Sequence, residues 1–160
     1  KAQYLDVAKD QANAEEKKLK DLQKELSSLE NEKSRMLKSI ESNKNSIISE
    51  KENITLMNNE LNTVRAARVG QDSLLASMDE GPAKKAKAEE IKDLDRRNRK
   101  AQNSIESSEK KIKRSNEEIE KATNSIPQNE KMQEKVREQI LQQQAVYDKY
   151  AEKLKKIKSY

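Results

Sequence analysis

Hydrophobic residues recur along almost the whole chain at alternating intervals of three and four positions. In the first half this spacing continues without a change of phase from Leu5 to Met78, and most positions on it are Leu, Ile, Val, Met or Ala. Residues spaced in this way lie on one stripe of an α-helix, and a repeat of about 3.5 residues lets two helices pack in a left-handed supercoil. We call this stripe the first seam, and it predicts one long helix.

The second half of the chain has a seam of its own. It begins at Lys84 and Lys87 and continues to Ile157, again with mostly apolar residues. The first seam, if it continued past the midpoint, would next meet Pro82 and Lys85, so the two seams differ in phase by two residues. The chain is therefore expected to contain two helices with a break between them.

Gly81-Pro82 lies where the phase changes, and it is the only Gly-Pro step in the sequence. Glycine tolerates the left-handed backbone that ends helices, while proline has no amide hydrogen and is favoured at the start of the next helix. The prediction is an all-α fold, a long antiparallel two-helix coiled-coil hairpin with its tip at Gly81-Pro82. Residues 1–78 form the first helix, residues 79–83 the tip loop, and residues 84–160 the second helix.

Charged seam residues favour this hairpin over a parallel homodimer. Reflection of the chain about Gly81 places each a position of one half opposite a d position of the other half, as antiparallel packing requires. A parallel dimer would instead bring each charged seam residue against its own copy, with unfavourable like-charge contacts. The residues concerned are Glu15, Lys33, Glu50 and Arg68. At about 1.5 Å per residue, the hairpin would be roughly 115 Å long.

Pro127 lies inside the second predicted helix and follows Thr123, Asn124 and Ser125, which suit a helix start better than an interior. A kink is therefore expected at residues 125–127. Because the seam keeps its phase through this region, we favour a kink within one coiled coil over a separate third helix. The predicted hinge residues are Gly81, Pro82 and Pro127.

Composition narrows the range of functions. Charged residues make up 39% of the chain and aromatic residues 2%, which is typical of long helices and coiled coils. The sequence has no Cys and no His, which excludes thiol nucleophiles, disulfides, Cys/His zinc sites and imidazole bases. We expect no enzymatic activity, no cofactor and no metal.

No stretch approaches the roughly 20 apolar residues of a membrane-spanning helix, and the expected location is the cytoplasm or nucleus. Because the sequence begins with Lys1, we expect it to be a piece of a longer protein.

Basic residues gather near the predicted tip, where several seam positions are polar and Gly70 weakens the helix by about 1 kcal/mol relative to alanine. They form a candidate surface for an acidic protein or for nucleic acid. Acidic residues are interleaved among them and no aromatic side chain is available to stack on bases, so a protein partner is favoured. The candidate contact residues are Arg65, Arg68, Lys84, Lys85, Lys87, Arg96, Arg97, Arg99 and Lys100.

The predicted architecture resembles the long antiparallel arms of chromosome-organising ATPases, dynein stalks and seryl-tRNA synthetase. We expect a structural or scaffold arm that spaces functional ends, for example in a chromosome-organising or motor ATPase or a cytoskeletal assembly. Protein partners are expected at the tip or the open end, with the hairpin monomeric or associated side by side. The alternatives are a nucleic-acid-contacting arm with a basic tip, and a parallel homodimeric filament rod.

Overall fold

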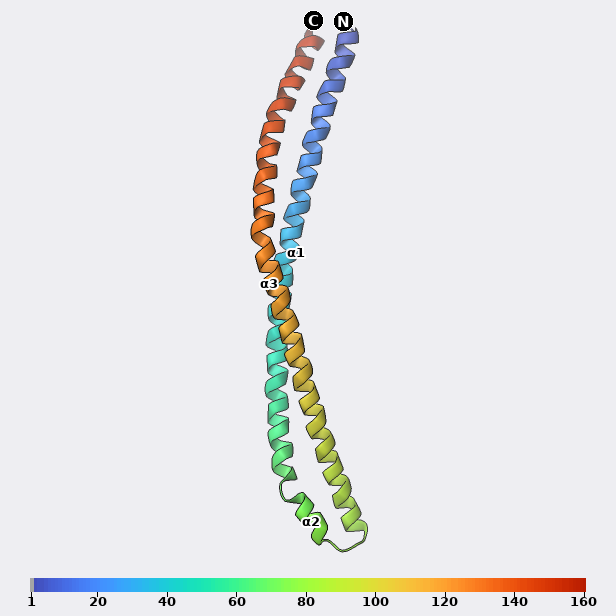
Figure 1. Cartoon of the computed structure of the whole chain (residues 1–160). Helices are drawn as coiled ribbons and strands as arrows, with labels where there is room; N and C mark the ends of the chain where they lie inside the picture. The colour runs from blue at the N-terminus through green and yellow to red at the C-terminus, as the bar shows by residue number, and fades with distance from the viewer. Residues whose placement is uncertain (1) are drawn as a thin grey trace. The chain divides into compact units, whose positions relative to one another are not determined.

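A computed structural model describes residues 2–160 and shows an all-α helical hairpin (Figure 1). Helix α1 spans Ala2–Arg68, the short helix α2 spans Gln71–Ser77, and helix α3 spans Pro82–Ser159. No β-strand occurs among these described residues. Neither Gly nor Pro occurs inside α1, and the many Leu, Lys, Glu, Gln and Ala residues of both long helices have high helix propensity.

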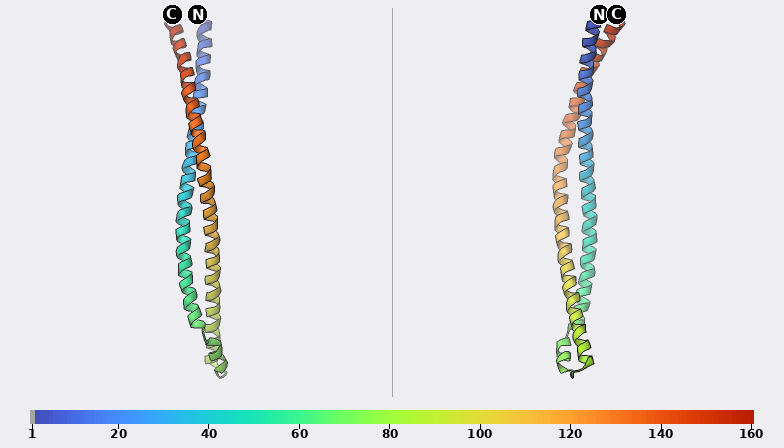
Figure 2. Two further views of the ribbon diagram at one scale, coloured as in Figure 1. Left: turned by 60° about the vertical axis from the view of Figure 1, so that its left-hand side comes forward. Right: turned by 90° about the vertical axis from the view of Figure 1, so that its right-hand side faces the viewer.

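The chain divides into two compact units. Unit 1 consists of Lys1–Ser39 and Lys121–Tyr160, and unit 2 consists of Ile40–Glu120. In each unit a segment of α1 lies antiparallel to a segment of α3, as the views in Figure 2 show. The ends of α1 and α3 near the chain termini lie beside each other in unit 1, and unit 2 contains the connection through α2.

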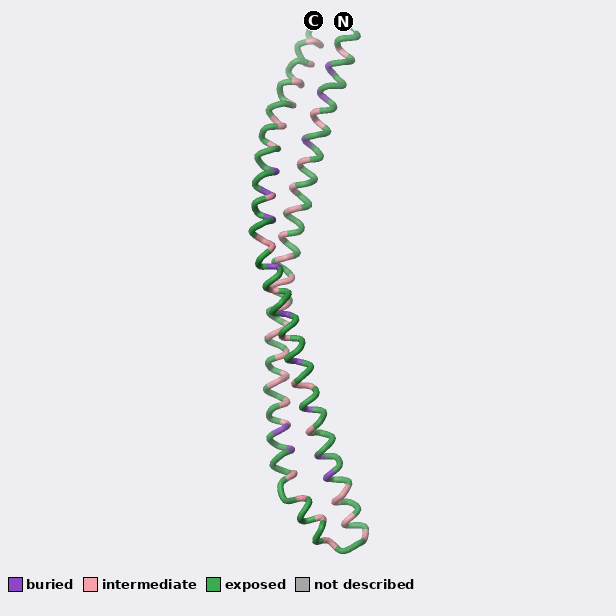
Figure 3. Tube along the Cα trace, viewed as in Figure 1, coloured by how far each residue is buried: buried purple, intermediate pink, exposed green. Residues whose placement is uncertain are grey.

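Each unit buries the seams that the sequence predicts. Every seam position predicted in either half of the chain is buried or partly buried, and Val64 and Val136 are each only 1% exposed. Figure 3 shows these positions as a broken line of buried and intermediate residues along the helices. Apolar residues outside the seams remain exposed, including Ile48, Leu56 and Leu141. The core is therefore one narrow stripe on each helix.

The first half of the chain is interrupted within unit 2, where the sequence analysis expects one helix over residues 1–78. Helix α1 ends at Arg68, and Gly70 adopts a left-handed conformation with φ 73° and ψ −2°. The amide of Val69 still donates to the carbonyl of Arg65, and the amide of Leu74 donates to that of Gly70 to begin α2. Glycine at this position is a common helix stop, because the left-handed region costs it little. The predicted weakening at Gly70 is thus a break.

The tip turn is shorter than the predicted loop of residues 79–83. Met78 is extended and donates its amide to the carbonyl of Leu75, and Gly81 has φ 156°, which L residues rarely adopt. Helix α3 begins at Pro82, and its first bond runs from the amide of Lys85 to the carbonyl of Gly81. Proline is well suited to the first helical position, where an amide hydrogen would have no helical partner.

Residues 125–127 lie inside α3 and do not end it. This agrees with one helix rather than a separate third helix in the second half. Pro127 cannot donate a hydrogen bond to the carbonyl of Thr123. The hydroxyl of Ser125 donates to the carbonyl of Lys121. The kink itself stays a prediction.

Replacement of Gly70 tests the break in the first half. In Gly70→Ala, the left-handed conformation costs about 1 to 2 kcal/mol, while alanine gains about 1 kcal/mol in a helix interior. Because the first seam keeps its phase across Gly70, we expect residues 66–74 to shift toward one continuous helix. Cα chemical shifts of these residues measure the change. Gly70→Asn, which tolerates the left-handed region, should keep the break, and unchanged shifts in the alanine variant would contradict the prediction.

Candidate interaction site at the hairpin tip

The basic residues predicted near the tip all belong to unit 2, but most of them are neutralised within the chain. Arg68 is the best connected, since its Nε lies 2.9 Å from Asp95 Oδ1 and its Nη2 lies 2.9 Å from Asp72 Oδ1. These two hydrogen bonds raise the pKa of Arg68 above its ordinary value. Arg68 thus ties the end of α1 to both α2 and α3.

Four other candidate contact residues also have acidic partners. Lys87 donates to Glu90 at 2.9 Å and, across the helix pair, to Gln71 Oε1 at 3.0 Å. The remaining ion pairs are Lys84 with Glu80 at 2.8 Å, Arg96 with Asp93 at 2.9 Å and Arg97 with Glu60 at 2.6 Å. Exposed pairs of this kind contribute only about 0 to 1 kcal/mol each, but they reduce the positive field at the surface.

The other candidate cations, Arg65, Lys85, Arg99 and Lys100, form no ion pair within the described residues and are exposed. They do not form one basic patch, because acidic side chains stand between them in the sequence and the structure. The geometry therefore supports a mixed-charge surface at the tip. Such a surface attracts phosphate less than the sequence list alone suggests.

A pocket of about 380 Å³ lies beside the break in the first half of the chain. The end of α1, the start of α2 and the middle of unit 2's α3 segment contribute its walls. The lining residues are Val64, Arg65, Arg68, Val69, Asp72, Asp95 and Asn98. Sequence reasoning did not single out Asp72, Asp95 or Asn98 as site residues. The spacing of Asp72 four residues after Arg68 is a signal that was available.

A second groove of about 800 Å³ lies against another side of α3. It is lined by Ala67 and by a mixed-charge stretch of α3 that includes Glu89, Asp93, Arg97 and Lys100. In unit 1, a groove of about 610 Å³ runs past Pro127 between Lys33 and Arg137. The predicted hinge residue Pro127 therefore lines an open surface, while Gly81 and Pro82 form the tip turn.

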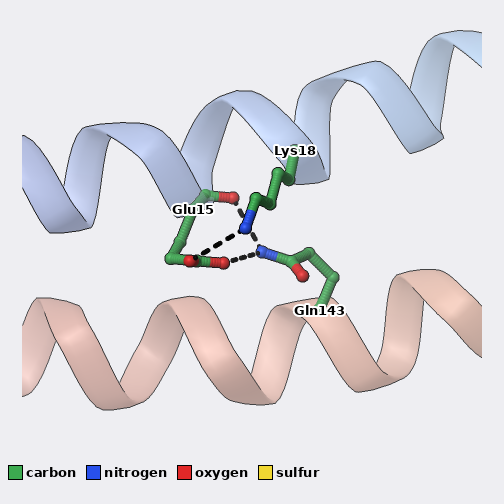
Figure 4. Close-up of polar contacts among 3 residues, drawn as sticks. All are labelled: Glu15, Lys18 and Gln143. Atoms are coloured by element: carbon green, nitrogen blue, oxygen red, sulfur yellow. Dashed lines mark hydrogen bonds and ion pairs between the residues drawn. The ribbon is translucent and has the colours of Figure 1, made fainter.

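Polar seam residues join the two helices in both units. In unit 1, Gln143 Nε2 donates to the side chain of Glu15 at 2.6 Å and to its backbone carbonyl at 3.0 Å, as Figure 4 shows with the nearby Lys18. Hydrogen bonding by Gln143 is the main reason why the pKa of Glu15 lies below its ordinary value of 4.5, and Lys18 adds a smaller effect. In unit 2, the Ser108 hydroxyl donates to Glu50 at 2.6 Å and accepts from Asn53 at 2.8 Å.

A buried amide chain forms another polar contact in unit 1. Asn129 donates to the carbonyl of Leu29, Gln133 donates to Asn129, and Arg137 donates to Gln133. Asn129 and Gln133 are only 5% and 4% exposed, so these bonds satisfy groups that would otherwise be costly to bury. Lys33 contacts Glu130 at 3.8 Å. The charged seam residues thus have polar partners on the opposite helix of the same chain.

Comparison with known proteins gives no relative: no protein-family model, curated protein or solved structure matches the chain. Among residues 2–160, no helix combines the length and the apolar character that crossing a bilayer requires. The same residues contain no cluster of three or more side chains suited to holding a metal ion.

The contact between Gln143 and Glu15 predicts a pH effect. Because the folded-state pKa of Glu15 is lowered, its contribution to stability is present above the unfolded pKa and is lost as the pH falls through the folded pKa. Gln143→Met removes the donor, so the pKa of Glu15 should rise toward 4.5 and this acid dependence should disappear. A ¹³C NMR titration of the Glu15 carboxyl carbon measures the pKa.

Gln144→Met is the matched control, because Gln144 bonds to Asp148 on its own helix. It should leave the pKa of Glu15 unchanged. An equal shift in both variants, or no shift in Gln143→Met, would show that the contact with Gln143 does not set this pKa.

Proposed function

We propose that the chain is a non-enzymatic structural arm, a coiled-coil hairpin that spaces two functional ends and presents its tip to a protein partner. The observation that carries this proposal is the pairing of α1 with α3 of the same chain through both seams. Each helix uses its only apolar stripe to cover the other, and its remaining surface is polar and charged. Such a pair provides stiffness and separation in place of a catalytic cleft.

The polar seam contacts support an intramolecular hairpin over a parallel homodimeric rod. Glu15 meets Gln143, and Glu50 meets Ser108, so each acidic seam residue faces a hydrogen-bond donor from α3. In a parallel dimer the same carboxylates would face their own copies. A single polar pair in such a seam can specify which helices associate and in which direction. We therefore propose the hairpin as the functional form.

Proteins are the proposed partners of the tip. Five of the nine candidate cations already pair with carboxylates of the same chain, which lowers the gain from binding a polyphosphate backbone. The tip instead combines charged groups of both signs with exposed apolar side chains, including Val69 at 77% and Leu74 at 44% exposure. This mixture of charged and apolar groups matches the surfaces that proteins use to recognise one another.

A spacer must keep its ends apart, and mass and length in solution test this. Light scattering should give 18.4 kDa for a single hairpin, and small-angle X-ray scattering should give a maximum dimension of about 115 Å, as expected for straight helices. A dimension near half this value would show that the two units fold over one another and would contradict the arm. A doubled mass with about doubled length would favour the parallel rod.

An engineered disulfide identifies the pairing directly, because the chain has no cysteine of its own. Asn53 and Ser104 lie on opposite helices with their side chains hydrogen-bonded at 3.0 Å. In Asn53→Cys/Ser104→Cys, oxidation should produce a disulfide within one chain at every protein concentration. Asn53→Cys/Lys121→Cys joins positions from different units and serves as the control. Disulfides formed mainly between chains in the first variant would overturn the hairpin.

A further inference from the structure

The pocket beside the break contains a buried acceptor that the chain does not satisfy. Asn98 Oδ1 is shielded from solvent and has no hydrogen-bond partner among the described residues. Asn98 is a seam residue, and Val64, which is 1% exposed and lines the same pocket, offers no side-chain donor. A buried acceptor without a donor costs about as much as a lost hydrogen bond, so a donor from outside the chain would be favourable here.

Two carboxylates line the same pocket. Arg68 uses one oxygen of each, Oδ1 of Asp72 and Oδ1 of Asp95, and it leaves the other oxygens to accept further bonds. The pocket also lies at the carboxyl end of α1, where the last helical carbonyls carry partial negative charge. The acceptors therefore come from α2 and α3, with the end of α1 beside them.

The remaining walls are apolar or positively charged. Val64 and Val69 supply methyl groups, and Val69 is 77% exposed at the edge of the pocket. Arg65 lies at the edge as well, is exposed, and forms no ion pair with the described residues. The charges of Arg65 and Arg68 balance those of Asp72 and Asp95, so the pocket is neutral before it binds a ligand.

We propose that this pocket binds a primary ammonium group on an aliphatic stem, in the form of a lysine side chain of the protein partner at the tip. An ammonium group has three donors that point in different directions, and it can reach acceptors from separate elements. A guanidinium is a flat fork suited to acceptors that lie side by side. The lysine stem packs along Val69 while its charge meets Asn98 and the carboxylates.

This inference rests on the proposed function, because the lysine belongs to a partner of the arm. One lysine side chain contributes a small part of such an interface, so the isolated group binds weakly, in the millimolar range. Arg65 opposes the ligand charge. Its replacement by a neutral residue should therefore strengthen binding.

An NMR titration of the full chain with n-butylammonium chloride tests the pocket without knowledge of the partner. At constant ionic strength, the side-chain amide of Asn98 and the methyl groups of Val64 and Val69 should shift and reach saturation. n-Butanol, which has the stem without the charge, and ammonium chloride, which has the charge without the stem, should give no saturable shift at the same concentrations. Shifts that rise linearly with n-butylammonium would overturn the proposal.

Variants of the pocket complete the test. Asn98→Leu keeps the seam position apolar and removes the acceptor, and it should weaken binding of n-butylammonium about tenfold. Arg65→Gln should tighten binding several-fold, since it removes an opposing charge. Equal affinity in Asn98→Leu and the original chain would overturn the role of Asn98. A failure here leaves the mass and length of the arm unaffected, so it can be told apart from a failure of the proposed function.

Discussion

The structure depends on one constraint: each long helix has a single apolar stripe, and only another helix can cover it. The stripe follows the alternating spacing of three and four residues, and all other faces are charged or polar. Burial of apolar surface contributes about 25 cal/mol per Å², so two exposed stripes along such long helices would be strongly unfavourable. Antiparallel pairing of α1 with α3 covers both stripes with residues of one chain.

Pairing along a narrow stripe explains why polar seam residues matter. Each of them interrupts the apolar core, and each is acceptable only when the opposite helix offers a suitable partner. Gln143 meets Glu15 and Asn129 meets the carbonyl of Leu29 in unit 1, while Ser108 meets Glu50 in unit 2. These contacts make one alignment of the helices better than an alignment shifted along the axis. The apolar residues alone, being repetitive, would distinguish such alignments poorly.

The same constraint weakens toward the tip, where the proposed interactions lie. Helix α2 contains no buried residue, and the left-handed Gly70 and the tip glycine Gly81 lie on either side of it. Its connections to the rest of unit 2 include the bonds from Arg68 to Asp72 and from Lys87 to Gln71. A segment held by exposed polar contacts opens more readily than a packed one. The break also creates the pocket that leaves Asn98 without a donor, so the local weakness and the proposed binding site have one cause.

The sequence by itself determined the all-α class, both seams and the turn at Gly81-Pro82, because helical periodicity and the backbone limits of glycine and proline are local properties. The break at Gly70 was visible in the sequence only as a weak position, since the first seam keeps its phase across it. Only the tertiary structure decided that this glycine becomes left-handed, that Arg68 bonds to Asp72 and Asp95, and that Asn98 lacks a partner. These features depend on which side chains of the opposite helix come within about 3 Å, and a repeating pattern of residue types does not specify that distance.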